Sequence, residues 1–547
     1  MKKLSRPLVF TLSFAALGLV WRLLFLPVSQ SSYTDGILQV DMFRQGLSYW
    51  PPLFALMARA LAWLPGVGLE GAGRLVALLA GVLILFPLCA AARRLFGLRA
   101  AFWAMAAWLA SPMALRWSLQ CMTDMPALAL WTAALAALIL GLEQYLPGLF
   151  PQAGPAPEPS ARTGNQWLLI ASLTAALATL TRYQGILLLP LILVAVWTCA
   201  RVARSLPTRA YNAWLTLLPW LAVAGWGALQ GMRSLAMHRQ QIGQRASVVS
   251  YWEFFESFLL IAPYFVTYGL FGFFLYGLFR TQWSTARLRW TAWACLYLGL
   301  AVLVGQSIFQ SFQERYLLPL LPLICLFAGH GLAVWERRCE RHPLRFWGLA
   351  GPTLAWGLLF SALVAVEQGS PFLDLKQAAL EVRRLNRPAA QVFSNETFNP
   401  LISTVKTSFW SGRSVTLLDS EAVNAGALKP GDLIVLSSYN AGGLEAYREL
   451  KAQLIQGLPA RPIHESFART ALPLLPDIMQ ESGPKSGTAQ SPAAWYFRNR
   501  RQYFETALLE VQAASGAEPL RPIPPRPAGE SGAIKQLEEL QKAAPKR

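Results

Sequence analysis

Residues 73–97 read GRLVALLAGVLILFPLCAAARRLFG, and no charged side chain lies between Arg74 and Arg93 in this stretch. An α-helix needs about 20 mainly apolar residues to cross the hydrocarbon core of a bilayer. The run is close to that length and ends in the pair Arg93 and Arg94, which is typical of a cytoplasmic boundary. The stretch therefore predicts a membrane-spanning helix.

The rest of the chain has a similar composition. Of its 547 residues, 54% are hydrophobic and only 14% are charged, and the mean hydropathy is +0.37. A soluble domain carries about 25% charged residues. This composition excludes an ordinary soluble enzyme and a disordered protein. The net charge of +19 comes from basic residues clustered between apolar runs, which indicates cytoplasmic loops and argues against a nucleic-acid partner.

Eleven apolar runs are long enough to be considered as spans. The first, at about 7–27, follows the basic start MKKLSR and is interpreted as a retained anchor rather than a cleaved signal, because no clear cleavage site follows it. The chain is therefore expected to be a polytopic α-helical membrane protein with about 11 transmembrane helices. The other runs lie at about 72–92, 100–115, 126–146, 167–181, 184–200, 212–232, 257–279, 290–310, 316–335 and 346–366.

Basic residues alternate between rich and poor loops, and this pattern predicts the orientation. The rich set comprises Lys2, Lys3, Arg6, Arg93, Arg94, Arg99, Arg162, Arg201, Arg204, Arg209, Arg280, Arg287, Arg289, Arg337, Arg338, Arg341 and Arg345. The poor set comprises Arg44, Arg59, Arg74, Arg116, Arg182, Arg233, Arg239, Arg245 and Arg315. The rich set is expected to be cytoplasmic, so the N-terminus lies inside and the C-terminal region outside.

The C-terminal region changes character and predicts a small soluble α/β domain. Short strands are expected at 391–395, 414–419 and 432–438, and helices at 374–385 and 443–454. We expect a membrane domain over 1–366, an extracytoplasmic α/β domain over 367–480, and a C-terminal extension with a partly disordered tail over 481–547. The six cysteines and four histidines show no disulfide framework and no metal-ligand spacing.

The first predicted outer loop, SSYTDGILQVDMFRQGLSYWPPLF at 31–54, holds two acidic residues. Apolar residues recur at three- to four-residue steps and predict an amphipathic helix near 36–48, with Asp41 and Arg44 as its polar members. Asp35, just beyond the first span, is a candidate general base, although it is also suited to cap that helix. Asp41 is favoured as part of a solvated helix face or as a structural partner of another residue.

The second outer loop, ALRWSLQCMTDMPALAL at 114–130, places Asp124 just before the next span. Taken alone, the TDMP pattern favours a helix cap. Together with Asp35 it puts two carboxylates on one side of the membrane, where such groups are energetically expensive and often functional. A catalytic contribution from Asp124 is therefore expected.

Three arginines of the same outer side complete the pattern: Arg182, Arg315 and Arg116. A guanidinium group suits phosphate because its planar fork donates several hydrogen bonds and keeps its charge, although each arginine taken alone could instead reach toward lipid headgroups. Carboxylates to activate a hydroxyl, arginines to bind a leaving phosphate and apolar grooves for a lipid tail suit sugar transfer from a polyprenyl-phosphate sugar.

Five stretches occur in an order that resembles the GT-C superfamily of membrane glycosyltransferases, above all the bacterial aminoarabinose transferases and protein O-mannosyltransferases. The resemblance covers about 1–335. The matching stretches are WPPLFALMARAL (50–61), GRLVALLAGVLILFPLCAAARRLFG (73–97), SLQCMTDMPALALWTAAL (118–135), LATLTRYQGILLLPL (177–191) and QERYLLPLLPLICLFAG (313–329).

The resemblance implies roles for individual residues. Asp35 takes the place of the family's first-loop catalytic Asp; many members have Asp-Glu there, whereas Gly36 follows here, so the choice between Asp35 and Asp41 as base stays open. Asp124 takes the second acidic position. By the resemblance, Arg182 takes the hairpin's basic position, and Arg315 takes the place of the family's RY arginine, which should face the donor phosphate. Together with Arg116, they are the expected phosphate-binding residues. Neighbouring side chains expected at the donor or acceptor site are Tyr33, Arg44, Tyr183 and Tyr316.

The expected activity is an inverting, polyprenyl-phosphate-sugar-dependent hexosyl- or pentosyltransferase of a bacterial-type inner membrane. The acceptor, whether glycan, lipid or protein, would be presented on the periplasmic side. No cofactor is expected. A divalent metal stays open as an alternative, although the outer loops contain no DxD motif to bind it. Two other interpretations stay open: a transporter or flippase for lipid-linked sugars, and a membrane-anchored assembly protein.

Overall fold

The computed structural model describes most of the chain, and its described residues fall into two compact units. The first unit comprises 1–29, 48–369 and 474–499, and the second comprises 30–47, 370–473 and 500–547. The described residues are 6–44, 50–145, 161–202, 213–231, 251–283, 286–309, 314–368, 372–395, 400–418, 428–438, 444–457, 460–469 and 503–512.

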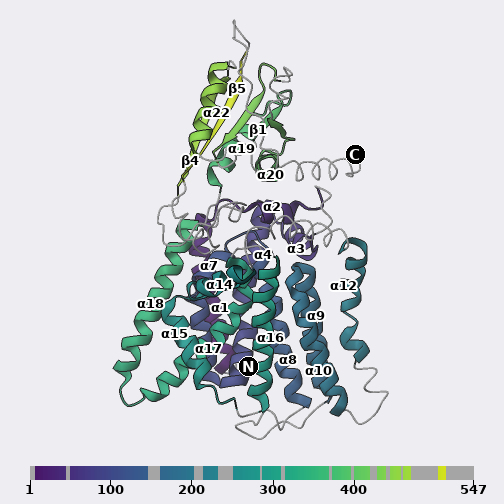
Figure 1. Ribbon diagram of the computed structural model, residues 1–547, viewed down its shortest axis with the longest axis vertical. Helices are drawn as coiled ribbons and strands as arrows, with labels where there is room; N and C mark the ends of the chain where they lie inside the picture. The colour runs from purple at the N-terminus through teal and green to yellow at the C-terminus, as the bar shows by residue number, and fades with distance from the viewer. Residues whose placement is uncertain are drawn as a thin grey trace. The chain divides into compact units, whose positions relative to one another are not determined.

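The first unit is built of helices that run alongside one another (Figure 1). Its described α-helices are α1 Arg6–Phe25, α3 Leu53–Leu61, α4 Leu69–Leu83, α5 Leu85–Phe96, α6 Leu98–Leu109, α7 Pro112–Ser118, α8 Asp124–Tyr145, α9 Ala161–Thr181, α10 Leu189–Val202, α12 Trp220–Trp226, α14 Tyr251–Ile261, α15 Tyr268–Arg280, α16 Ala286–Phe309, α17 Leu321–Arg338 and α18 Pro343–Gln368. Short 3₁₀ or π segments are η1 Leu26–Val28, η3 Tyr183–Leu188, η4 Gly227–Gly231, η5 Ala262–Phe265 and η6 Glu314–Leu320.

Every predicted apolar run falls on one or more helical segments, but fewer of them are long straight spans than expected. Within the described residues, five segments have the length and composition to cross a membrane, and two helix pairs bent by 60° and 103° raise the number to seven. Three further apolar helices are shorter, at Tyr183–Cys199, Trp220–Leu229 and Trp290–Gly305. The predicted run 257–279 is one of the bent pairs, because the chain turns sharply between η5 and α15.

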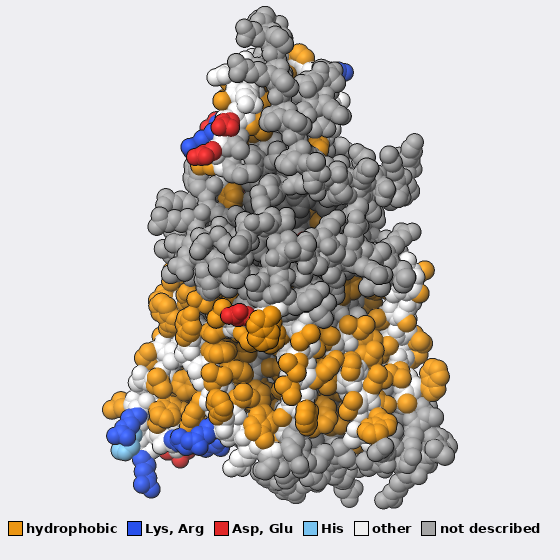
Figure 2. Space-filling model, in the orientation of Figure 1, with side chains coloured by type: hydrophobic (Ala, Val, Ile, Leu, Met, Phe, Trp, Pro, Cys, Tyr) orange, Lys and Arg blue, Asp and Glu red, His pale blue; other side chains and the backbone are white. Residues whose placement is uncertain are grey.

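Apolar side chains cover the face of this helical unit seen in Figure 2 in a broad band. Large apolar side chains of this unit that are exposed include Leu24, Leu83, Trp197 and Trp293. A soluble protein rarely exposes a continuous apolar surface of this kind, whereas a membrane protein presents it to lipid. Exposed basic residues lie at the turn between α17 and α18, at Arg337, Arg338, Arg341 and Arg345. Both features agree with a multi-span membrane protein.

Close helix packing in the first unit depends on glycines. A Cβ atom on Gly277 of α15 would meet the backbone of Phe327 on α17, and one on Gly331 of α17 would meet the backbone of Phe273 on α15. Small residues at such crossings let two helix backbones approach within van der Waals contact, which stabilises helix association in lipid. Helices α8 and α9 also pack along each other, and they position the site described below.

The second unit contains a five-stranded mixed sheet with strand order β2-β1-β3-β5-β4. Strand β1 (Val392–Asn395) pairs in parallel with β2 (Thr416–Leu418) and with β3 (Leu433–Ser437), whereas β5 (Tyr503–Val511) is antiparallel to both β3 and β4 (Ala460–Arg469). Its helices are α19 Leu373–Leu385, α20 Pro400–Ser411 and α22 Leu444–Gly457. Apolar side chains of β1, β3, β5 and α22 form its core.

The three predicted strands and two predicted helices of this region are confirmed as β1, β2, β3, α19 and α22. Strands β4 and β5 are additions to that prediction. Strand β5 comes from the stretch that the sequence assigned to a C-terminal extension, and it occupies a central place in the sheet.

The first-loop helix α2 (Thr34–Asp41) also belongs to the second unit, where it packs against α20. It overlaps the amphipathic helix predicted near 36–48, begins two residues earlier and ends at Asp41. The end of the predicted segment, 45–49, lies outside the described residues.

Candidate active site

Asp124 is the first residue of α8, and its carboxylate faces the guanidinium of Arg182. The side chain of Asp124 is 1% exposed, and Arg182 Nη1 lies 2.9 Å from Asp124 Oδ1. The same Nη1 donates a hydrogen bond to Thr123 Oγ1 at 3.2 Å. A carboxylate in the first turn of a helix is further stabilised by the positive end of the helix dipole. The carboxylate therefore lies beside a guanidinium group in a nearly water-free position.

The described part of the chain does not supply the hydrogen bonds that the Asp124 carboxylate can accept. Neither of its carboxylate oxygens accepts a hydrogen bond from a described residue, so the ion pair with Arg182 is its main polar contact there. A buried charged oxygen without hydrogen bonds costs free energy. Such an oxygen is suited to accept a hydrogen bond from a ligand or from water in the adjoining pocket.

Arg182 is fixed by the turn that follows α9. Its Nε donates to Gln184 Oε1 at 3.0 Å, and its guanidinium carbon lies 5.4 Å from the centre of the Tyr316 ring. The turn is tight because Gly185 packs directly on the backbone of α9, where a Cβ atom would overlap Ala178 and Thr179. The glycine thus allows the hairpin that aims Arg182 at the start of α8.

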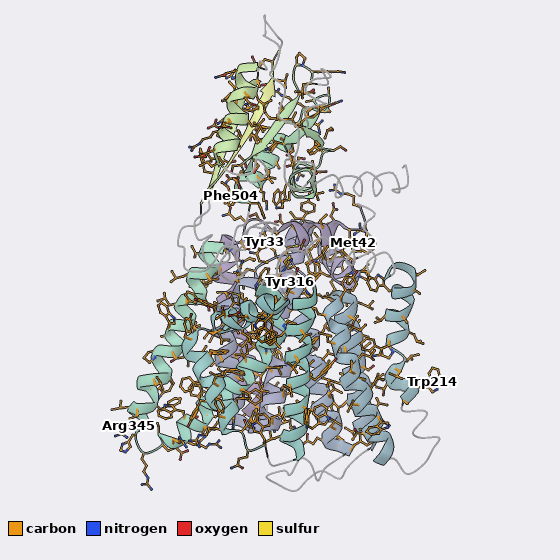
Figure 3. The ribbon with its side chains drawn as sticks, viewed as in Figure 1. Tyr33, Met42, Trp214, Tyr316, Arg345 and Phe504 are labelled. Atoms are coloured by element: carbon orange, nitrogen blue, oxygen red, sulfur yellow. The ribbon has the colours of Figure 1, made fainter. Side chains whose placement is uncertain are left out.

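Arg315 reaches the same region from η6. Only 5% of the residue is exposed, and its guanidinium carbon lies 5.4 Å from the centre of the Tyr316 ring and 5.9 Å from that of Trp117. The Tyr316 ring is therefore close to two guanidinium groups, and aromatic faces attract such cations. Figure 3 labels Tyr316, which lies toward the end of the helical unit opposite to Arg345.

A pocket opens where these residues meet. Its empty space, counted with the open mouth, is about 290 Å³. Two arginines against one carboxylate make its charge positive, a pattern that favours a phosphate group. The polar lining is Asp124, Arg182, Gln184 and Arg315, and the remaining lining is Ala127, Leu128, Trp131, Ala178, Gly185, Leu318 and Pro319.

The structure thus brings together three of the predicted site residues, Asp124, Arg182 and Arg315, from segments far apart in the chain. Tyr316 adjoins both arginines. Arg116 does not line the pocket; its guanidinium lies 4.9 Å from the ring centre of Trp117. Tyr183 packs on Trp226, with ring centres 5.5 Å apart.

The predicted first-loop residues lie in the second unit. Asp41 is engaged by Arg44, whose Nη2 lies 2.7 Å and Nε 2.9 Å from the same oxygen, Oδ2. Asp35 lies in the first turn of α2 and is half-buried, and Tyr33 precedes the helix. Arg44 therefore acts here as an ion-pair partner of Asp41.

Gln184 is a pocket residue that the sequence did not indicate. Its Oε1 accepts from Arg182, and its Nε2 donates to the Tyr316 carbonyl oxygen at 3.5 Å, so it links η3 to η6. Its position two residues after Arg182 was the only available signal. Within the described residues, no three His, Cys, Asp or Glu side chains are grouped as metal ligands.

Residues 50–156, which include Asp124, match the family model described as dolichyl-phosphate-mannose-protein mannosyltransferase. Among solved structures, ArnT from Cupriavidus metallidurans bound to undecaprenyl phosphate is similar with a TM-score of 0.58 and 18% identity, over 93% of this chain and 99% of that chain. The apo state of the same protein gives 0.56 and 17%, over 84% and 97%. No curated protein sequence matches the chain.

The archaeal oligosaccharyltransferase AglB from Archaeoglobus fulgidus, in complex with an inhibitory peptide and a dolichol-phosphate, is similar with a TM-score of 0.50 and 13% identity, over 81% of this chain and 72% of that chain. The likeness to ArnT extends over nearly all of both chains and shows a shared fold, a helical multi-span membrane body followed by a mixed β-sheet region. The chain thus has an ArnT-like membrane fold, and its residues 50–156 are similar to the mannosyltransferase family model.

Proposed function

We propose that this protein is a glycosyltransferase that moves a sugar, with inversion, from a polyprenyl-phosphate donor to an acceptor hydroxyl on the extracytoplasmic side of the membrane. The observation that carries the proposal is the pocket lined by Arg182, Arg315 and Asp124, in which Arg182 pairs with Asp124. A pocket with two guanidinium groups and an otherwise largely apolar lining is suited to a phosphate that carries a lipid tail.

The two arginines would act on the leaving group. When the bond between the sugar and the phosphate breaks, negative charge grows on the phosphate oxygens, and fixed guanidinium groups stabilise that additional charge more than they stabilise the singly charged donor phosphodiester. Asp124 would hold Arg182 in place by the ion pair at 2.9 Å. It is thus assigned a positioning role rather than that of a base.

Asp35 is proposed as the general base that removes the acceptor proton while the hydroxyl oxygen attacks the anomeric carbon. The choice over Asp41 rests on the ion pair with Arg44, which already occupies the Asp41 carboxylate. Removal of such a base typically lowers the rate by about 10²–10⁴-fold.

The distribution of basic residues supports the extracytoplasmic position proposed for the pocket. Exposed basic residues gather at the α17–α18 turn, and Tyr316 lies toward the opposite end of the helical unit from Arg345 in Figure 3. Because basic loops stay on the cytoplasmic side, the pocket would face the exterior. The likeness to an ArnT structure that holds undecaprenyl phosphate supports this class of lipid carrier.

The test is transfer of labelled sugar from a panel of undecaprenyl-phosphate sugars by purified full-length protein in lipid nanodiscs. The unaltered protein is expected to release undecaprenyl phosphate and label an acceptor. Arg315→Ala is expected to raise the donor KM at least tenfold, whereas the exposed-site control Arg337→Ala keeps the original value. Flipping of the donor across the membrane without breakage of the sugar–phosphate bond would show a transporter instead.

A further inference from the structure

The helix that carries Asp35 is attached to the C-terminal α/β region. Residues 30–47 form one compact unit with 370–473 and 500–547, although the first spanning helix lies next to them in the chain. Lys376 Nζ of α19 donates a hydrogen bond to the carbonyl oxygen of Gln30, 346 positions away. The C-terminal region therefore holds the segment that enters α2.

Aromatic contacts reinforce this attachment. The Tyr33 ring meets the Phe372 ring edge to face, with centres 6.4 Å apart at 88°. Lys376 Nζ also lies 5.8 Å from the centre of the Trp410 ring on α20, the helix against which α2 packs. One lysine thus connects the entry to α2 with both α19 and α20.

Helix α2 depends on such packing because it is short. It has eight residues, and isolated helices below about 12–15 residues are marginal in water. Its apolar side chains Ile37 and Val40 are fully buried. The local position of Asp35 is therefore determined by what α2 packs against.

Phe372, which contacts Tyr33, has an unfavourable backbone conformation. Its backbone is left-handed, with φ of 59°, which is unfavourable for a bulky residue unless the surroundings hold it. Its ring contacts Tyr33, and Lys406 Nζ lies 2.9 Å from the ring centre. The buried Lys406 and the Tyr33 ring both help to keep Phe372 in this place.

We propose that Lys376 and Phe372 are positioning residues that fix α2 and thereby the local position of the Asp35 carboxylate. This inference rests on the proposed function, in which Asp35 is the base. Because a misplacement of about 1 Å can cost about 100-fold in rate, loosening of α2 lowers turnover without altering donor binding.

The experiment compares Lys376→Met with Lys451→Met in full-length protein. Lys451 is on α22 and pairs with Glu465, away from α2 in the same unit. Lys376→Met is expected to raise hydrogen exchange of the α2 amides at least tenfold and to lower kcat at least tenfold, with an unchanged donor KM. Lys376→Arg, which still donates to the Gln30 carbonyl, should restore both values, and Lys451→Met should change neither.

Unchanged exchange in α2, or unchanged kcat despite faster exchange, would overturn the positioning role. Asp35→Asn is measured in parallel to keep the two proposals apart. If Asp35→Asn keeps normal transfer, the assignment of the base fails, while the exchange data still decide whether Lys376 orders α2. If Asp35→Asn abolishes transfer and Lys376→Met has no effect, only the positioning inference is lost.

Discussion

At the scale of single residues, the ion pair of Asp124 and Arg182 is asymmetric. The Asp124 side chain is 1% exposed, whereas that of Arg182 is 14% exposed and has further contacts with Thr123 and Gln184. A buried charge that loses its partner is far more costly than a partly exposed one, since water can solvate only the second. The two members should therefore respond differently to removal.

Arg182→Met is expected to destabilise the protein by about 3 kcal/mol, because it leaves the Asp124 carboxylate buried without a cation. Asp124→Asn should cost about 1 kcal/mol or less, since Arg182 retains its other hydrogen bonds. Both should lower sugar transfer. Thermal unfolding of the purified variants, with Arg337→Met as an exposed control, checks this; equal losses of stability would contradict the asymmetry.

The motifs around Asp124, Arg182 and Arg315 made it possible to predict that these residues belong to one site. Gln184 could not be predicted in the same way, because its role depends on a contact with the backbone of Tyr316, 132 positions away. The Asp41–Arg44 pair needed only a helical step of three residues, so the expectation of a structural partner for Asp41 was accessible from sequence.

At the scale of elements, the crossing of α15 and α17 leaves no room for side chains at two positions. A Cβ atom on Gly277 would lie 2.8 Å from Gly331 N as well as against the Phe327 carbonyl, and real Cβ atoms do not approach so closely. Gly272 on the same helix α15 has nothing within 4 Å of its Cβ position. A comparison of alanine substitutions at Gly277 and Gly272 therefore separates the steric cost of a new Cβ atom from the effect of helix propensity.

Gly277→Ala is expected to lower stability by about 1–3 kcal/mol, because α15 and α17 must move apart. Gly272→Ala should be neutral or slightly stabilising, since alanine favours a helix over glycine by about 0.5–1 kcal/mol. Thermal unfolding in detergent distinguishes the two variants. If Gly277→Ala unfolds at the same temperature as Gly272→Ala, the close crossing is not required.

Asp374 on α19 makes the second unit sensitive to pH. Burial raises the pKa of its carboxyl above the ordinary value of 3.8, against the opposing hydrogen bond from Thr506 Oγ1 at 2.6 Å. A raised folded-state pKa means that the folded protein binds the proton more tightly than the unfolded chain. Stability from this group is therefore complete at low pH and falls as pH rises through the folded-state pKa.

Asp374→Asn should therefore stabilise the unit near pH 7 and flatten its stability profile above the ordinary carboxyl pKa. The opposite sign is expected at Glu381, whose pKa is lowered by hydrogen bonds from Arg384, so that its contribution is present at neutral pH and lost in acid. Hydrogen exchange of β5 amides, corrected for intrinsic rates, measures both. A profile unchanged by Asp374→Asn would contradict the cause assigned to Asp374.

The sheet illustrates which elements a sequence reveals. Strands β1 and β3 are short apolar runs in a polar region, and their buried faces are legible from composition. Strand β4 contains Arg461, Pro462 and Glu465 and has a register shift between Pro462 and His464, so its pattern is irregular. Strand β5 lies between β3 and β4 and is antiparallel to both. No local sequence pattern encodes this pairing.

At the scale of the whole molecule, the apolar runs made the membrane class predictable, because burial in lipid needs no knowledge of tertiary contacts. The number of straight spans could not be predicted in this way, since the bends of 60° and 103° arise from packing. Helix α18 follows the basic α17–α18 turn and leads to the C-terminal region. Its 26 residues extend about 39 Å, enough to cross a bilayer from the basic α17–α18 turn.

The chain that leaves α18 should therefore emerge on the side opposite to Arg345, and the C-terminal domain should be extracytoplasmic. Cysteine labelling can test this, because five of the six native cysteines are buried and the sixth is half-buried. Gln377→Cys and Arg345→Cys alter exposed positions on α19 and at the start of α18. In intact spheroplasts, a membrane-impermeant maleimide should label Gln377→Cys at once and Arg345→Cys only after permeabilisation. The reverse order would invert the orientation and place the Arg182–Arg315 pocket on the cytoplasmic side, and equal labelling of both would show that α18 does not cross.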